Sequence, residues 1–385
     1  MPDIKAIQSE LRANKIDGWL FYDHHHRDPI AYRILGLSDS LHVSRRWYYL
    51  IPAQGEPRKL THRVESGKLA SLPGTGHLYS SWQELENGLR IMLEPYQTLA
   101  MQYSPRNAIM YVSMVDAGTV EVLREMGKTI VSSADLVSRF EAVLTAEQIA
   151  SHYQAQKSID EIVSEAWKYI AAGPRSEYQV MVWLREAMRR AGIADGYGPN
   201  VSVNENSSDS HYEPTAASSR QIKQGDFLLI DIWGRMDRPE SCFYDITWTG
   251  VVGREPTDRE RQVFALVAQA RDAAIRTVQD AFTAGRPIAG WEADDAARAV
   301  IRNAGFADYF THRTGHSISY ETHGNGANLD NLETHDERLI LPHTCFSVEP
   351  GIYLPEFGVR SEVNMLTEPG RATVTGPIQT ELVRI

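Results

Sequence analysis

Two aspartates interrupt apolar, strand-like runs, where ionised side chains are normally excluded. Asp231 lies within Phe227–Trp233 (FLLIDIW), and Asp245 lies within Phe243–Val252. Side chains alternate along a strand, so Asp231 shares a face with the apolar residues two positions away, and that face should be buried. A buried carboxylate is costly unless it is paired or binds a cation. Any fold of this chain must therefore supply these two acids with a partner.

Two predicted hairpins bring four acids together. The turn-like segment Gly234–Pro239 separates the two runs, so a hairpin should place both aspartates side by side. Glu349 follows a third run, Thr344–Val348, and Glu362 lies in a fourth, Val359–Leu366, with a turn containing glycine and proline between them. The second hairpin would pair these glutamates and complete a cup of four inward carboxylates.

A cup of this kind indicates bound cations. Four like charges at contact distance cannot all stay ionised in a dry site. The simpler alternative is that each acid pairs with a nearby arginine, which is common for one acid but not for four acids on two strand pairs. A mostly oxygen-donor set with one imidazole suits Mn²⁺, Co²⁺ or Zn²⁺, and bridging carboxylates suit two ions about 3.5–4 Å apart.

Several histidines could supply the imidazole. His312 and His316 are four residues apart, but a Thr-Gly pair between them argues against a zinc-protease helix, so one ligand is expected instead of two. His323 follows seven residues after His316, and His211 lies in a predicted loop over 206–212. Taken singly, each histidine fits an ordinary surface or core position.

The pattern of predicted helices and strands changes near residue 140, where we place a domain boundary. Residues 1–140 alternate helical segments with short apolar runs such as Gly18–Tyr22 and Trp47–Ile51, which predicts a smaller α/β domain. Residues 141–385 combine long helices with hairpins, which predicts an α+β domain. Capping-box spacings and stop signals predict helices that begin after Thr145, Ser176 and Thr257, with a fourth helix over Trp291–Asn303.

Composition excludes several classes of partner. The 50 acidic and 39 basic residues give a formal charge of −11, which argues against a general nucleic-acid binder because such a protein needs a basic face. The only two cysteines, Cys242 and Cys345, favour a reducing compartment, and Cys345 is expected to be a plain core residue. We predict neither a signal peptide nor a membrane span, and therefore a cytoplasmic protein.

Five short motifs occur in the order Asp, Asp, His, Glu, Glu: LLIDIWG with Asp231, YDITWTG with Asp245, HRTGHSI with His316, FSVEPGIY with Glu349 and GVRSEV with Glu362. In this order they resemble the metal-ligand motifs of the prolidase, aminopeptidase P and creatinase family. The resemblance covers nearly the whole chain. It implies an α+β pita-bread catalytic domain over 141–385 with a dinuclear metal site, a creatinase/prolidase-type N-terminal α/β domain over 1–140, and a homodimer.

The resemblance also implies a role for each matching residue. The five motif residues would bind two divalent ions, Mn²⁺ first with Co²⁺ or Zn²⁺ as alternatives, and a water bridging the ions would attack a peptide carbonyl. Glu349 would in addition shuttle a proton, and His211 and His323 would position the substrate and stabilise the intermediate. Three further residues would support the substrate or the ligands: Tyr353, Arg360 and His312.

The activity implied is metal-dependent hydrolysis at Xaa-Pro bonds, by a dipeptidase or an aminopeptidase. Departures from the family pattern keep a second possibility open, in which the same fold acts on a small non-peptide substrate by C–N hydrolysis or elimination. The loop between Asp231 and Asp245 is long, with 13 residues between the two; Ser317 and Ser319 replace glycines of the family's GHGIG motif; and an acidic residue is missing after His323. A non-catalytic binding module is the third alternative, although all five ligand types are kept.

The run His24–His26 is a less specific feature. Three consecutive histidines cannot all face one ion from an extended strand, and no matching acids accompany them, so a loop is expected. In dimers of the resembled family, a neighbour's N-terminal loop can approach the active site. A contribution of these histidines to the site of a second subunit therefore stays open.

Overall fold

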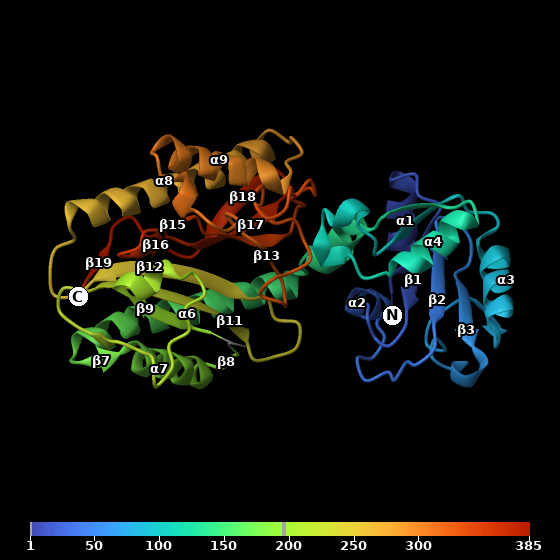
Figure 1. Cartoon of the computed structure of the whole chain (residues 1–385), viewed down its shortest axis with the longest axis horizontal. Coiled ribbons are helices and arrows are strands. Elements are labelled where there is room, and N and C mark those ends of the chain that lie inside the picture. The colour runs from blue at the N-terminus through green and yellow to red at the C-terminus, as the bar shows by residue number, and fades with distance from the viewer. Residues whose placement is uncertain (1, 195–197) are drawn as a thin grey trace. The chain divides into compact units, whose positions relative to one another are not determined.

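The computed structural model describes residues 2–194 and 198–385 (Figure 1). The chain divides into two compact units, Met1–Phe140 and Glu141–Ile385, called here the N-terminal and C-terminal units. Within the described residues, no helix is both long enough and apolar enough to cross a membrane.

The N-terminal unit is built on one mixed sheet. Its strands are β1 (Gly18–Asp23), β2 (Trp47–Pro52), β3 (Arg58–His62), β4 (Thr75–Tyr79), β5 (Thr98–Met101) and β6 (Thr129–Ser132). They lie in the order β4-β3-β2-β1-β5-β6, with β1 antiparallel to β2 and parallel to β5. The helices are α1 (Ile4–Ala13), α2 (Pro29–Leu35), α3 (Trp82–Leu93), α4 (Ala117–Glu125) and α5 (Ala134–Val137).

Helices cover both faces of this sheet. All six residues of β1 are buried, and they alternate between two cores: Trp19 and Phe21 belong to the core under α1 and α2, whereas Leu20 and Tyr22 belong to the core under α3 and α4. Burial on both faces explains why β1 and β2 consist of continuous apolar and aromatic runs instead of alternating patterns.

The described residues of the C-terminal unit form four long helices and four small sheets. The helices are α6 (Ala146–Ala171), α7 (Glu177–Arg190), α8 (Asp258–Thr283) and α9 (Gly290–Asn303). The strands are β7 (Arg175–Ser176), β8 (Ile193–Ala194), β9 (Asn200–Val203), β10 (Gln221–Ile222), β11 (Phe227–Met236), β12 (Tyr244–Val251), β13 (Ser317–Ile318), β14 (Cys345–Val348), β15 (Gly351–Tyr353), β16 (Gly358–Arg360), β17 (Val363–Glu368), β18 (Arg371–Thr375) and β19 (Val383–Arg384).

The long helices begin where the sequence predicted. Thr145, Ser176 and Thr257 each accept a hydrogen bond from the backbone three residues later, and the side chain at that position returns the bond. These reciprocal bonds satisfy amide groups that the first turn of a helix leaves free. The fourth helix, α9, begins one residue before the predicted start.

The two helix pairs enclose the strands. In Figure 1, α6 and α7 lie on one side of the β11–β12 hairpin, and α8 and α9 lie on the other side beyond β17 and β18. Each pair has its own core: Leu228, Ile230 and Ile232 of β11 pack with α6 and α7, whereas Phe227 packs with α8. The β11 face that carries Asp231 is therefore turned away from α6 and α7, towards the interior between the sheets.

The run Val359–Leu366 is not the single strand that its sequence predicted. It divides into β16, which pairs with β15 (Gly351↔Arg360), and β17, which pairs with β14 (Val348↔Val363). The prediction of one strand was wrong because the Glu362 amide leaves this ladder and donates to the Thr247 carbonyl of β12 at 3.3 Å, although the register continues across the break. Glu349 and Glu362 lie where one ladder ends and the other begins, so neither is confined within a continuous strand pair.

Candidate metal centre

One cavity of about 700 Å³ in the C-terminal unit gathers the predicted site residues. Nine of the ten line it: His211, Asp231, Asp245, His312, His316, His323, Glu349, Arg360 and Glu362. The tenth, Tyr353, reaches the same group through hydrogen bonds to His312 and Arg360. Asp231, Asp245, His316 and Glu362 are between 3% and 8% exposed, so any charge on them is largely removed from water.

The β11–β12 hairpin places both aspartates on the cavity face. Its antiparallel register aligns Asp231 with Thr247 and Trp233 with Asp245, so the two acids lie diagonally on neighbouring strands, two residue pairs apart and on the same face. Asn364 on β17 fixes the position of Asp245, because its side chain accepts from the Asp245 amide at 2.9 Å and donates to the Asp245 carbonyl at 2.7 Å. The predicted hairpin is thus present, and it is tied to the sheet that carries the glutamates.

A close backbone approach positions His316. A Cβ atom on Gly315 would lie 2.0 Å from the Ser347 carbonyl oxygen, so only glycine allows this contact. The His316 amide donates to Ser347 Oγ at 2.9 Å, and the Ser347 hydroxyl donates to Glu349 Oε1 at 3.0 Å. These bonds set His316 beside Glu349.

The His316 ring turns an open nitrogen towards the acids. Its Nδ1 lies 3.2 Å from the Ser317 carbonyl, which can only accept, so Nδ1 carries the proton. Nε2 lies 3.4 Å from Glu349 Oε1 and 3.6 Å from Asp245 Oδ2. A lone pair that faces two carboxylate oxygens requires a proton or a metal ion between them.

Arg360 and Thr247 hold the other side of the centre. Arg360 Nη2 lies 2.5 Å from Asp231 Oδ2, and its Nε donates to Thr247 Oγ1 at 2.8 Å. Thr247 Oγ1 in turn lies 3.1 Å from Asp231 Oδ1 and 2.8 Å from Glu362 Oε2. The simpler alternative was that each acid pairs with an arginine, and Asp231 does so. Asp245, Glu349 and Glu362 instead face one another and His316.

The pKa values show that the acids cannot all be charged without further cations. Burial, and then the charges of the other three acids, raise the pKa of Glu362 well above its usual range. Burial raises the pKa of Asp231 to about 7 and also raises that of Asp245. Burial opposes ionisation of Glu349 as well, but the charges of His316, His312 and Arg360 outweigh it and lower its pKa.

These residues fit divalent cations. One ligand atom each from Asp245, His316 and Glu362 lies within 4.8 Å of the other two. The set offers carboxylate oxygens and one imidazole nitrogen, and its unbalanced negative charge is what bound divalent ions would neutralise. The donor chemistry suits Mn²⁺, Co²⁺ or Zn²⁺ and does not choose among them.

A relay of hydrogen bonds orients His312. Its Nδ1 donates to the Arg313 carbonyl at 2.7 Å, so Nε2 accepts from the Tyr353 hydroxyl at 2.6 Å. Arg360 Nη1 approaches the same hydroxyl at 3.4 Å. His312 Nε2 therefore faces Tyr353, whereas His316 Nε2 faces Asp245 and Glu349.

His323 lies against His316 on the cavity wall. The two rings are 4.4 Å apart and nearly perpendicular. The positive charge of His316, and then burial, lower the pKa of His323 to about 3, so this imidazole is neutral at ordinary pH. A neutral imidazole can donate one N–H to a substrate oxygen.

Sequence reasoning missed three residues of the network: Thr247, Ser347 and Asn364. Thr247 lies two residues after Asp245, and Ser347 lies two residues before Glu349, so strand alternation could have placed both on the ligand face. Asn364 also lies two residues after Glu362, but the strand break between them hides that relation.

His24–His26 lie in the N-terminal unit, in bends after β1, where Asp23 accepts from the amides of His26 and Arg27.

Comparison with known proteins agrees with the geometry. Residues 150–369 match the family described as metallopeptidase family M24. A probable dipeptidase PepE of Mycobacterium tuberculosis is 27% identical over 334 residues, 84% of this chain and 82% of that protein. An Xaa-Pro dipeptidase of Pyrococcus furiosus is 29% identical over 244 residues, 63% of this chain and 65% of that protein.

The fold is shared over the whole chain. The crystal structure of dipeptidase PepE from Mycobacterium ulcerans aligns with a TM-score of 0.71 at 21% identity, covering 99% of this chain and 96% of that one. This likeness confirms the expected α+β architecture with a pita-bread C-terminal unit. Because the family match spans more than half of the sequence, the chain belongs to metallopeptidase family M24.

Proposed function

We propose that this protein is a metal-dependent peptidase that cleaves Xaa-Pro bonds, as a dipeptidase or an aminopeptidase. The observation that carries the proposal is the convergence of four carboxylates and one imidazole on one cavity, with too little positive charge around them. The names of the relatives add support, since they describe a dipeptidase and an Xaa-Pro dipeptidase.

Five residues would hold two divalent ions: Asp231, Asp245, His316, Glu349 and Glu362. Bound ions in such a centre supply Lewis acidity and lower the pKa of water to near neutrality. Thr247 and Arg360 keep Asp231 and Glu362 in place through the bonds to Thr247 Oγ1. Ser347 keeps Glu349 beside His316.

Other residues would handle protons and the substrate. Glu349, whose pKa is lowered, is ionised and can accept a proton from the attacking water and return it to the leaving amine. His323 is neutral and lines the same cavity, so its N–H can stabilise negative charge that develops on the substrate carbonyl oxygen. His211 lines the cavity from a loop and would help to position the substrate.

The alternative of a small non-peptide substrate loses two of its motivating observations. Ser317 Oγ accepts from the Gly326 amide, and Ser319 Oγ accepts from the Glu321 amide, so both hydroxyls are engaged with the following loop. The tip between β11 and β12 is anchored on α6, where Arg238 donates to Gln154 and the Cys242 amide donates to Ser151. Neither the two serines nor residues 234–243 line the cavity that holds the acids.

The proposal is tested with metal-depleted protein and a panel of Xaa-Pro dipeptides and longer peptides. Addition of Mn²⁺ should restore cleavage, and Asp245→Asn should lose both bound metal and activity. His323→Ala should lower kcat by about 100- to 1,000-fold, as expected for loss of an oxyanion-stabilising donor, with metal content unchanged. His335→Ala, which alters an exposed histidine of the same unit, is the matched control. Full activity without metal would contradict the proposal.

We also propose that the protein works in the cytoplasm as a homodimer. Its two cysteines are unpaired thiols, which suits a reducing compartment. The dimer rests on the family resemblance alone. Light scattering of the purified chain tests it, and a monomer at micromolar concentration would contradict it.

A further inference from the structure

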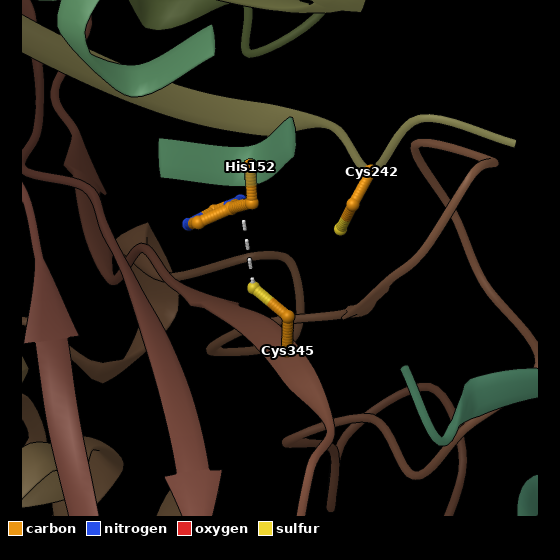
Figure 2. A group of neighbouring side chains, drawn as sticks. All are labelled: His152, Cys242 and Cys345. Carbon is orange, nitrogen blue, oxygen red and sulfur yellow. Dashed lines mark hydrogen bonds between the residues drawn. The ribbon is translucent and has the colours of Figure 1, made fainter. Parts of the chain in front are cut away.

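A second group of metal-type ligands lies in the C-terminal unit, apart from the carboxylate centre. His152 on α6, Cys242 just before β12, and Cys345 at the start of β14 point towards one another (Figure 2). All three are at most 1% exposed. Their surroundings are apolar, with Leu144, Phe243, Ile318 and Leu366 in the same core cluster. The sequence predicted Cys345 to be an ordinary core residue and did not predict that His152 and Cys242 would lie beside it.

The distances suit a single ion. One ligand atom from each residue lies within 4.8 Å of the other two, and Cys345 Sγ lies 4.0 Å from His152 Nδ1. In a tetrahedral zinc site, Zn–S and Zn–N bonds of 2.3 and 2.0–2.1 Å place sulfur about 3.6 Å from nitrogen and about 3.8 Å from a second sulfur. The ligand atoms therefore need to approach one another by at most about 1.2 Å.

The imidazole has a partner that can orient it for metal binding. His152 Nε2 lies 2.8 Å from Thr375 Oγ1, and this hydroxyl can pass a bond on to the Asn364 carbonyl at 3.5 Å. An ion at Nδ1 would leave the ring proton on Nε2, where the Thr375 hydroxyl can accept it, and this is the usual arrangement around metal-binding histidines. In this structure Nδ1 donates to the Phe243 carbonyl oxygen at 2.6 Å, and the Cys242 thiol donates to the same oxygen at 3.6 Å, so an ion would replace both hydrogen bonds.

We propose that His152, Cys242 and Cys345 bind one Zn²⁺ ion in a structural site. Two thiolates neutralise the charge of one divalent ion, so the complex can lie in apolar surroundings without a buried net charge. Thiolate and imidazole ligands select zinc over the harder Mn²⁺ that oxygen-rich sites prefer. A bound divalent ion deprotonates the thiols that coordinate it, so neither cysteine has to be ionised beforehand.

The site would tie three elements of the C-terminal unit together. Cys242 precedes Asp245 by three residues on the way into β12, and Cys345 precedes Glu349 by four residues through β14. An ion here would join α6 to the two strands that deliver these acids. Its role is structural, and it does not depend on which bond the carboxylate centre hydrolyses.

Cobalt substitution distinguishes this site from the carboxylate centre. The chain contains only these two cysteines, so any thiolate-to-cobalt charge-transfer absorption in the near ultraviolet must come from them. Full-length protein is kept reduced, purified from zinc-supplemented expression, and exchanged with Co²⁺. We expect the absorption band in the wild type and a third equivalent of metal beyond the two expected at the carboxylates.

Variants assign the band to its ligands. Cys242→Ser/Cys345→Ser should lack the band entirely, and His152→Asn should shift or weaken it. Asp245→Asn, at the other centre, should keep it unchanged and is the matched control. If the cysteine variants fail to fold, the wild-type spectrum still decides the matter, because a folded, cobalt-loaded wild type without the band would overturn the proposal. A Cys242–Cys345 disulfide found by mass spectrometry in the reduced preparation, or a band unchanged by His152→Asn, would overturn it as well.

Discussion

Single polar side chains hold the acids of the candidate centre in fixed positions. The Thr247 hydroxyl carries one proton and lies within hydrogen-bonding distance of Asp231 and Glu362, while it accepts from Arg360. It is fully buried, so water cannot replace it. Outer groups of this kind hold metal ligands in a fixed orientation, and their loss weakens the site without removing a ligand.

Replacing Thr247 separates this role from ligation. Thr247→Val keeps the shape of the side chain but removes the hydroxyl, and it should weaken Mn²⁺ binding by about 10- to 100-fold. Calorimetric titration of metal-depleted protein measures the change. Thr247→Ser retains the hydroxyl and should bind within a few-fold of the wild type. Equal affinities for the valine variant and the wild type would show that the hydroxyl does not position the acids.

At the level of secondary-structure elements, close backbone contacts decide where ligands lie. The segment before β13 approaches β14 so closely that Gly315 leaves no room for a side chain. This approach lets the His316 amide bond to Ser347 and brings the imidazole to the acids on β12 and β14. A strand contact thus determines a ligand position.

Gly315→Ala should push these segments apart. A Cβ atom 2.0 Å from the Ser347 carbonyl forces a backbone shift, which should cost about 1–3 kcal/mol as for other overpacked sites. Thermal unfolding and Mn²⁺ titration should both show a loss. Gly67→Ala is the control, because nothing lies within 4 Å of its added Cβ. A variant with wild-type stability and affinity would refute the requirement for glycine.

The start of α8 provides a pH-dependent contact. Glu260 bonds to the Thr257 amide at 2.7 Å and pairs with Arg254 at 2.6 Å. Burial opposes its ionisation, but these partners outweigh burial and lower the pKa of Glu260 below the ordinary 4.5. Because the folded state favours the carboxylate, the contact stabilises the fold above pH 4.5 and is lost as the pH falls through the lowered pKa.

Glu260→Gln should therefore destabilise the protein most at neutral pH. We expect a loss of about 1–3 kcal/mol at pH 7, typical of a hydrogen bond to a charged group. Urea unfolding at several pH values should show the difference from wild type shrinking below about pH 4.5. Glu356→Gln, at an exposed position, should have little effect at any pH. A loss for Glu260→Gln that is independent of pH would contradict this account.

At the level of the whole molecule, bound ions should stabilise one unit selectively. The repelling acids all lie in the C-terminal unit, whereas the sheet of the N-terminal unit has cores of its own. A cation that binds the folded unit but not the unfolded chain stabilises it by about 2.7 kcal/mol at a concentration of 100 Kd. For a unit of this size, that corresponds to roughly 5–10 °C in Tm.

Calorimetry of the full chain should resolve this effect. Chelation should lower the transition of the C-terminal unit by roughly that amount, and added Mn²⁺ should restore it. A transition of the N-terminal unit should stay in place and serves as the internal control. A shift of both transitions together, or of neither, would contradict selective stabilisation by the acids.

Local patterns in the sequence were sufficient for much of the architecture. Strand alternation placed Asp231 on a buried face, capping boxes marked the starts of α6, α7 and α8, and the order of five motifs pointed to family M24. These features follow from rules that act over a few residues, namely a period of two in strands and the unsatisfied amides of a first helical turn. Such features can therefore be predicted without knowledge of the tertiary fold.

Contacts between distant segments could be seen only in the folded chain. Thr247 meets Glu362 across 115 positions, and His152 meets Cys345 across 193. The strand break beside Glu362 likewise depends on the bond from its amide to Thr247 of β12. These contacts depend on how sheets and helices pack over the whole unit. A local pattern predicts which face of a strand a side chain occupies, but not which residue lies opposite it. The acids in the apolar runs were evident from the sequence, and only the tertiary structure supplied their partners.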